Sequence, residues 1–251
     1  MDINVISFNI RCANDPNGHS IAERAPRLYQ IISPLGADVI GLQEYTPAWE
    51  PYIAEYFGYE YAILNRWRAE ANREGSPILY RKDRFDCLER GCFWLSDTPE
   101  VESRGWDNYF NCYRVCLFAI LREKESGRAF TFMNTHFGGG DACQTQSADL
   151  IAAYSKRISD LPTLVTGDFN MTPRSAGYTA MTAHFTDVNA ATARDGRATF
   201  HGYEPTAHPD EHIDYCFVGQ GITPLGWELL DGTVEGKFPS DHYGLNIKIR
   251  I

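Results

Sequence analysis

The sequence predicts an α/β protein in which two β-sheets pack face to face and helices cover their outer faces. Short apolar runs of strand type recur from Ile3 to Ile251, whereas few segments have apolar residues at helical spacing. Acids, amides and imidazoles follow several of these runs, and two packed sheets would place all of these polar clusters at one rim. No Pro/Ser-rich linker or internal repeat divides the 251 residues, so we expect one domain over 1–251.

Three segments have the apolar spacing of helices. In residues 22–35 the apolar side chains fall on one helical face, and Gly36 ends the helix. Residues 147–158 repeat this pattern, and 175–183 show it more weakly. We therefore expect a few helices inserted between many strands.

The predicted strands are short, and they are either apolar throughout or alternate apolar with polar residues. They cover residues 3–9, 39–42, 77–80, 85–95, 114–123, 129–134, 163–166, 213–218, 224–230 and 243–251. A strand so close to the C-terminus indicates that the end of the chain completes a sheet begun at the N-terminus.

The charge balance is acidic, with 23 Lys+Arg against 33 Asp+Glu and a formal net charge of -10. Proteins that hold long nucleic acids usually carry a basic stripe, because neutralised phosphates supply most of the non-specific affinity. The balance therefore argues against a tight, sequence-independent DNA-binding protein. Cleavage of a short nucleic acid needs only a local basic patch and remains compatible with it.

Cysteine usage and the N-terminus indicate a reduced, cytoplasmic setting. Seven cysteines are an odd number, and neither a C-x-x-C motif nor paired histidines indicate zinc. The first residues, MDINVISFNI, lack the basic start and apolar core of a signal peptide, although a signal removed beforehand would leave no trace. No apolar stretch approaches the roughly 20 residues that a membrane span needs, so we expect no transmembrane segment.

The motif Asp168-Phe169-Asn170 directly follows one predicted strand. In an extended segment, side chains two residues apart point to the same side, so Asp168 and Asn170 can act together. A carboxylate can orient or deprotonate a water molecule, and an amide can hold a phosphate oxygen without adding repulsive charge. The same residues also suit a turn, which is the plainer interpretation of this motif alone.

Two histidines have candidate carboxylate partners. Asp241-His242 precedes the last strand, and Asp214, at the start of another strand, would fix the tautomer of His242 and stabilise its charged form. His136 would need a similar partner, for which Glu74 is the candidate. Two such pairs facing one phosphate could donate to its oxygens and protonate the leaving group. Solvent-exposed His and Asp in loops are the plainer alternative.

Glu44 ends the run DVIGLQE and has no basic neighbour in sequence. A carboxylate of this kind suits a hard cation such as Mg²⁺ or Mn²⁺. A surface Glu at a strand end is the ordinary alternative. Metal-assisted attack on a phosphate ester is the chemistry that most naturally needs all of these clusters at one site.

In their order along the chain, these motifs resemble the endonuclease/exonuclease/phosphatase superfamily, which includes DNase I, exonuclease III and inositol polyphosphate 5-phosphatases. The matching motifs are Asn9, Gln43-Glu44, Glu74-Gly75, Asn134-Thr135-His136, Gly167-Asp168-Phe169-Asn170, Ile213-Asp214-Tyr215 and Ser240-Asp241-His242. Gly-Asp-Phe-Asn and Ser-Asp-His at this separation are highly specific together. The stretches 93–107 and 198–202 also resemble the compact bacterial branch of the superfamily.

The resemblance implies a four-layer α/β/β/α sandwich of the DNase I type, with two mainly antiparallel sheets. It also implies hydrolysis of a phosphate ester with Mg²⁺ or Mn²⁺. In the family pattern Glu44 binds the metal, with Asn9 and Asp241 in its shell. Asp168 and Asn170 position or activate the attacking water and hold the phosphate.

The resemblance places both histidines on the scissile group. His242, oriented by Asp214, and His136, oriented by Glu74, contact this group, and one of them serves as acid or base. Arg114 matches a phosphate-contacting arginine of nucleases in the family, which makes it a candidate substrate-binding residue beside Asn170. The identity of the general base stays open.

Two departures from the family pattern lie beside these motifs. Phe137-Gly138-Gly139-Gly140-Asp141 follows His136 where many bacterial members have Leu-Asp-His, and this small loop is expected to leave room for a substrate group. Tyr243-Gly244 follows Ser-Asp-His, which should affect strand geometry more than chemistry. Neither departure changes a candidate catalytic side chain.

The acidic balance favours a phosphorylated small molecule or a short nucleic acid as substrate. We also expect the protein to be a monomer. A nuclease would need a basic approach surface, for which the candidates are Arg66, Arg68, Arg73 and Arg104. A lipid phosphodiesterase would need an exposed apolar hairpin, for which the candidates are Trp67, Trp106, Tyr109 and Phe110. Aromatic residues that simply pack their own loop are the plainer alternative. A catalytically inactive phosphate-binding scaffold is a further one, although no residue of the catalytic pattern is missing.

We predict weak and salt-sensitive binding to long duplex DNA, because a net charge of -10 repels a polyanion at long range. Each neutralised phosphate adds about 0.9 to the slope of log affinity against log salt, so the affinity falls as salt rises. The few contacts of a local basic patch keep both this slope and the affinity modest. Fluorescence anisotropy with a labelled random duplex at several salt concentrations measures both quantities. Nanomolar binding at physiological salt would make a nuclease the leading interpretation.

Overall fold

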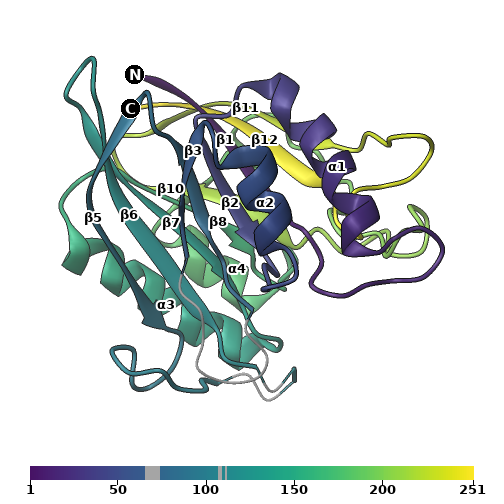
Figure 1. Cartoon of the computed structure of the whole chain (residues 1–251). Coiled ribbons are helices and arrows are strands. Elements are labelled where there is room, and N and C mark those ends of the chain that lie inside the picture. The colour runs from purple at the N-terminus through teal and green to yellow at the C-terminus, as the bar shows by residue number, and fades with distance from the viewer. Residues whose placement is uncertain (66–73, 107–108, 111) are drawn as a thin grey trace.

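Each central strand sends its side chains alternately into two different layers. In β1 (Asp2–Asn9), Ile3 and Val5 point into the core between two sheets, whereas Ile6 and Phe8 pack towards the helices. The computed structural model describes residues 1–65, 74–106, 109–110 and 112–251. It confirms the predicted α/β/β/α sandwich (Figure 1).

The first sheet has the strand order β11-β12-β1-β2-β4-β3, and the second has β5-β6-β7-β8-β10-β9. Besides β1, the first sheet contains β2 (Val39–Gln43), β3 (Tyr61–Leu64), β4 (Ile78–Arg81), β11 (Thr223–Leu230) and β12 (Gly244–Arg250). The second contains β5 (Phe85–Trp94), β6 (Val115–Glu123), β7 (Ala129–His136), β8 (Thr163–Asp168), β9 (Thr186–Asp187) and β10 (Asp214–Val218).

Each sheet contains one pair of parallel strands at its centre. β1 runs parallel to β2 and β7 runs parallel to β8, while the other paired neighbours in both sheets are antiparallel. Each parallel pair is joined through a helix, α1 (Ile21–Ile32) in the first sheet and α3 (Asp141–Ile158) in the second. Because parallel strands end at the same edge, the polar residues that follow them meet at one rim of the sandwich.

The helices cover the outer faces of the two sheets. Apolar side chains of α1 and α2 (Glu50–Phe57) pack on the first sheet, and those of α3 and α4 (Ala176–Thr182) pack on the second. A short 3-10 helix, η1 (Ser33–Leu35), and α5 (Val188–Ala191) complete the set in the described part of the chain. None of the described helices is both long and apolar enough to cross a membrane.

The structure differs from the predicted elements in several places, which include the unpredicted short elements β9 and α5. Helix α3 begins at Asp141 rather than at 147, because Gly140 (φ 90°) ends the glycine-rich loop and the polar first turns lack an apolar face. The short elements α2 and β3 were not predicted, since eight and four residues carry little periodicity. Strands β7 and β8 extend to His136 and Asp168, so these two residues belong to the strands themselves.

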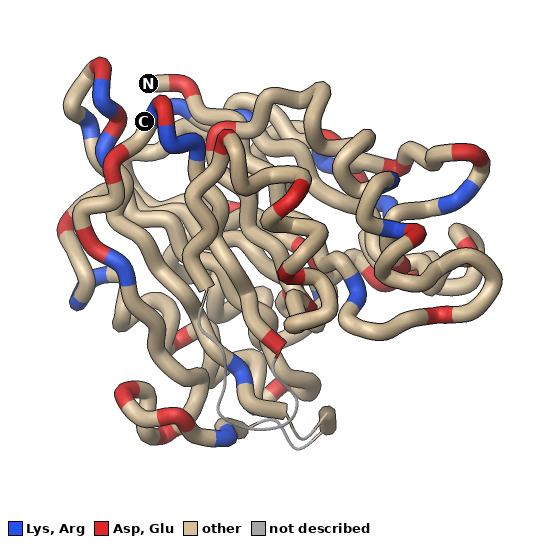
Figure 2. The backbone as a smooth tube through the Cα atoms, in the orientation of Figure 1, with Lys and Arg blue, Asp and Glu red and all other residues tan. Residues whose placement is uncertain are grey.

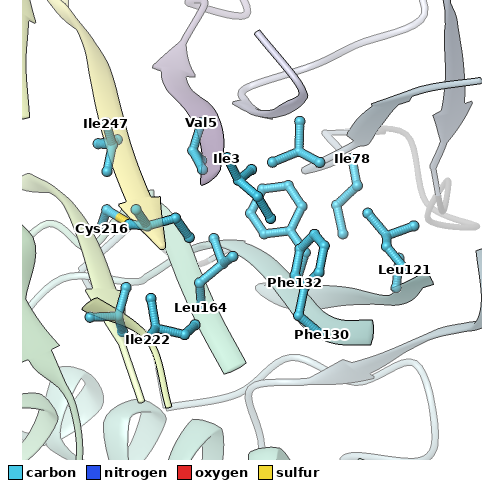
Figure 3. Packing of buried hydrophobic residues seen from close by; sticks show 14 of the residues in the cluster. Ile3, Val5, Ile78, Leu121, Phe130, Phe132, Leu164, Cys216, Ile222 and Ile247 are labelled. Carbon is cyan, nitrogen blue, oxygen red and sulfur yellow. The ribbon is translucent and has the colours of Figure 1, made fainter. Parts of the chain in front are cut away.

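Apolar residues of both sheets fill the space between them, and Figure 3 shows part of this core. Ile3 and Val5 of the first sheet face Phe130, Phe132 and Leu164 of the second. The side chains of all five are at most 2% exposed. Burial of this apolar surface is the main force that holds the two sheets together.

One polar side chain, Asn134 of β7, crosses this core directly below the rim. Its Nδ2 donates to the backbone oxygens of Leu42 (2.8 Å), Ser76 (3.1 Å) and Pro77 (3.0 Å) in or beside the first sheet. Its Oδ1 accepts from Gln43 Nε2 of β2 at 2.8 Å. Buried amides are stable only when hydrogen-bonded, so these contacts fix the position of one sheet relative to the other.

Gly41 of β2 leaves the space that Asn134 occupies, which yields a stability prediction. A Cβ at Gly41 would lie 2.5 Å from both Asn134 Oδ1 and Thr166 Oγ1. We expect Gly41→Ala to lower the free energy of unfolding by about 1–3 kcal/mol, the range of overpacked cores. Gly226→Ala in β11 is the matched control, because its nearest neighbour would be Lys248 Cβ at 4.0 Å. Urea unfolding of both variants measures the difference, and equal stabilities would contradict the prediction.

Candidate active site

The candidate site lies where the inward-facing row of each central strand changes from apolar to polar. In β1 the inward row ends at Asn9, and in β7 and β8 it ends at His136 and Asp168. The strand register pairs His136 with Asp168 and Asp168 with Asp214, the first residue of β10. The carboxyl ends of four strands and the amino ends of β10 and β12 therefore converge at one place.

Asp168 lies at the centre of this group and is 2% exposed. Its Oδ2 accepts a hydrogen bond from Asn9 Nδ2 at 2.9 Å and lies 3.5 Å from His136 Nε2 and 3.7 Å from His242 Nε2. Its Oδ1 accepts from the backbone N–H of Asn170 at 2.9 Å. Burial raises the pKa of Asp168, although His136 and His242 oppose the shift.

Each imidazole is backed by its own carboxylate. His242 Nδ1 lies 2.9 Å from Asp214 Oδ2, and His136 Nδ1 lies 2.8 Å from Glu74 Oε1. Burial disfavours the charged form of His242, but Asp214, Asp168 and Asp241 outweigh it and raise the pKa of His242 to about 10. Both partners proposed from the sequence thus lie in contact with their histidines, and both Nε2 atoms face Asp168.

Asn170 closes one side of the site. It has a left-handed backbone (φ 49°), which turns the chain sharply after β8. Its Nδ2 lies 3.0 Å from His136 Nε2 and donates to the backbone oxygen of Phe137 at 2.9 Å. The motif therefore forms a turn, as in the plainer interpretation, and it also lies in the candidate site.

Glu44 and Asp241 lie on the opposite side of Asp168. Glu44 adopts φ 59°, and its carboxylate accepts from Asn9 Nδ2 at 3.1 Å and from the Cys12 N–H at 2.7 Å. Burial opposes its charge, yet the pKa of Glu44 lies below its ordinary value because His136 and Cys12 stabilise the carboxylate. Burial raises the pKa of Asp241, and the charge of Glu44 adds to this shift.

These residues fit a divalent cation. Glu44, Asp241 and Asn9 offer hard oxygen atoms at one place, and the carboxylates of the site outnumber its cationic side chains among the described residues. Asp168, Asp214 and His242 form a second group, whose ligand atoms lie within 4.8 Å of one another. Asp214 Oδ1 in this group is buried without a hydrogen-bond partner. Asp214 Oδ2 is already paired with His242 Nδ1 at 2.9 Å, so the first group is the more open to a cation.

Arg114 contacts Glu74 of the site. Its Nη1 donates to Glu74 Oε1 at 3.0 Å, the same oxygen that pairs with His136. Sequence reasoning did not identify Arg11, although its guanidinium lies 3.5 Å from Asp241 Oδ2 and 4.0 Å from Glu44 Oε2. No periodic signal marked it, because β1 ends at Asn9 and the left-handed backbone of Arg11 (φ 61°) departs from the alternation of the strand.

The glycine-rich loop after His136 leaves less room for a substrate group than expected. The space beside Gly139 is taken, since a Cβ there would lie 2.9 Å from Tyr109 Cβ, whereas Gly140 has open space around it. Tyr109 and Phe110 are exposed and Trp106 donates to Asp97 Oδ1 within its own loop. The candidates Arg66, Trp67, Arg68 and Arg73 lie outside the described residues.

Residues 6–242 match the Endonuclease/Exonuclease/phosphatase family. The chain belongs to this family. As a member of the endonuclease/exonuclease/phosphatase family, it carries the two histidine–carboxylate pairs, the central Asp168 and the Glu44–Asp241 group in one rim. The match begins within β1 and ends at His242, so it covers the whole of this rim.

Solved structures of other family members share the fold. An endonuclease/exonuclease/phosphatase family protein from Bacteroides thetaiotaomicron is 28% identical, with a TM-score of 0.91 over 99% of this chain and 97% of that one. The mannosyl-6-phosphatase Bt3783 of the same species is 28% identical, with a TM-score of 0.89 over 99% and 100%. In sequence, protein R895 of Acanthamoeba polyphaga mimivirus is 27% identical over an alignment of 216 residues, which covers 72% of this chain and 31% of that protein.

Proposed function

We propose that this protein hydrolyses phosphate esters of small molecules with the help of a divalent cation, Mg²⁺ or Mn²⁺. The observation that carries the proposal is the placement of Asp168 between two imidazoles, each backed by a carboxylate, opposite the acids Glu44 and Asp241. A tetrahedral phosphate needs donors for its oxygens, an acceptor for the proton of water and a positive charge for its leaving oxygen. This rim offers all three.

Glu44, Asp241 and Asn9 would hold the cation. When bound, it would neutralise phosphate charge and stabilise the leaving oxygen. Glu44 is suited to this role because its carboxylate is kept ionised by the Cys12 N–H and His136. Asn9 also bonds both Glu44 and Asp168, so it would keep the cation side and the water side of the phosphate at a fixed separation.

Asp168 is the proposed general base. Its Oδ2 would orient the attacking water and take its proton as the water oxygen bonds to phosphorus and the bond to the leaving oxygen breaks. Burial raises the pKa of Asp168, which strengthens it as a proton acceptor. His242 is protonated at neutral pH, because its pKa is about 10, and it would donate to the phosphate oxygens together with His136.

The charge of the chain supports a small substrate over a long nucleic acid. In the view of Figure 2, basic segments are interspersed with acidic ones and form no continuous stripe over the described residues. Among the described residues, Arg11 and Arg114 contact the site, and both are paired with acids. The mannosyl-6-phosphatase of similar fold further supports a phosphorylated sugar or a related phosphomonoester as the substrate class.

We predict that hydrolysis requires an added divalent cation, because the acids of the rim otherwise repel a phosphate. Hydrolysis of a panel of sugar phosphates, nucleotides, phospholipids and short oligonucleotides, with Mg²⁺, Mn²⁺ or Ca²⁺, measures both the requirement and the substrate class. Phosphate release reports on the monoesters, and chromatography of the products reports on the diesters. Mg²⁺ and Mn²⁺ should serve better than Ca²⁺, whose larger shell positions oxygens less tightly. Full activity after exhaustive chelation would disprove the metal assignment, and a preference for oligonucleotides would favour a nuclease.

We predict that His242→Ala and Asp168→Ala each lower kcat by roughly 10²-fold or more, the scale of one lost acid–base or positioning group. Asp214→Asn should cost less than His242→Ala, since the imidazole remains but loses the charge that orients it. His184→Ala, which removes an exposed imidazole outside the rim, is the control. Steady-state hydrolysis of bis-p-nitrophenyl phosphate with Mn²⁺ gives the order.

A larger loss for Asp214→Asn than for His242→Ala would contradict the orienting role of Asp214. Unchanged activity of Asp168→Ala would contradict the general base. Absence of hydrolysis by the wild-type protein over the whole panel would favour an inactive phosphate-binding scaffold.

A further inference from the structure

The loop that follows β1 turns a cationic side chain back over the acids of the rim. Arg11 adopts a left-handed backbone (φ 61°), and its N–H donates to Asn9 Oδ1 at 3.0 Å. For a residue other than glycine this conformation is uncommon and needs support from its surroundings. The hydrogen bond to Asn9 supports this conformation and holds Arg11 beside Asn9.

The guanidinium of Arg11 is shared by three carboxylates. Nε and Nη2 pair with the two oxygens of Asp15 at 3.0 and 3.2 Å, whereas Nε lies 3.5 Å from Asp241 and Nη1 lies 4.0 Å from Glu44. Tyr203 donates its hydroxyl to Asp15 at 3.2 Å. Arg11 is thus anchored on Asp15, while its Nε and Nη1 also lie near the two acids proposed to bind the cation.

A second arginine fixes the backbone of this loop. Arg24 of α1 is fully buried and donates to the backbone oxygens of Ile10, Arg11 (3.0 Å) and Ala13 (2.6 Å). It also donates to His19 at 2.8 Å. These bonds fix the carbonyls of the loop and hold its backbone close to Glu44 and Asp241.

We propose that Arg11 is the counter-charge of the metal site and lowers its affinity for a divalent cation. The inference rests on the proposed function, since it takes Glu44 and Asp241 as metal ligands. Without a cation, Arg11 offsets the charge of two largely buried carboxylates that would otherwise repel each other. With a cation, the same carboxylates are shared between the metal and the guanidinium.

Simple electrostatics gives the size of the effect. A unit charge and a double charge about 6 Å apart repel each other enough to change a dissociation constant roughly tenfold, even at the dielectric constant of water. The repulsion is stronger in a partly buried site, where screening by water is weaker. Arg11 is one-third exposed, so the estimate for water is the lower bound.

Direct Mn²⁺ titration, with free Mn²⁺ counted by electron paramagnetic resonance, tests this role without an activity assay. Arg11→Met removes the charge and keeps the length of the side chain, and we expect its Kd for Mn²⁺ to fall about tenfold or more. Arg11→Lys keeps the charge and should stay within about threefold of wild type. Arg250→Met is the control, because it removes the same charge from the opposite end of β12, where Arg250 pairs with Asp2.

A Kd that is unchanged or higher in Arg11→Met would overturn the proposal and would mean that Arg11 organises the ligands instead. Should this variant fail to fold, Arg11→Gln, which keeps a donor for Asp15, carries the same expected gain in affinity. Glu44→Gln should abolish the tight Mn²⁺ site. Failure of the wild-type protein to bind Mn²⁺, or tight binding by Glu44→Gln, would overturn the metal assignment itself.

Discussion

The hydrogen bonds of Asn134 determine the relation between the two sheets and, with it, the geometry of the rim. Hydrophobic burial holds the sheets together but does not fix their register, because apolar contacts are non-directional. The Asn134 amide bonds three carbonyls and one amide across the interface, and these bonds are satisfied in only one relative position. His136 and Asp168 come from one sheet and Asn9 and Glu44 from the other, so their distances depend on this position.

Above this contact, charges that would be costly alone are arranged to stabilise one another. Asp168 is fully enclosed, and its carboxylate is tolerated because Asn9, Asn170 and two imidazoles surround it. Each imidazole is in turn held by a carboxylate on its far nitrogen. The site is therefore assembled before any ligand arrives, which reduces the reorganisation that a reaction in it would require.

The strand ends and the loops of the rim are held in place by different contacts. Residues at strand ends are fixed by sheet register and by Asn134, and these include the residues whose motifs resemble the family. The loops after β1 and around Tyr109 are shaped by their own contacts, such as the Arg24 bonds and the packing of Tyr109 on Gly139. In the proposed function, the strand ends therefore supply the catalytic groups of the rim, and the loop after β1 adjusts how tightly the cation is held.

The sequence by itself determined the fold class, most strands, and the residues of both histidine pairs. Apolar periodicity is a local property, and short motifs such as Gly-Asp-Phe-Asn keep their spacing wherever the chain folds. Only the tertiary structure decided that Arg114 reaches His136 through Glu74, that Arg11 lies over Glu44 and Asp241, and that Tyr109 fills the space beside Gly139. These contacts join residues far apart in the chain or depend on a left-handed backbone. Neither leaves a periodic signal in the sequence, because each is set by how distant segments pack.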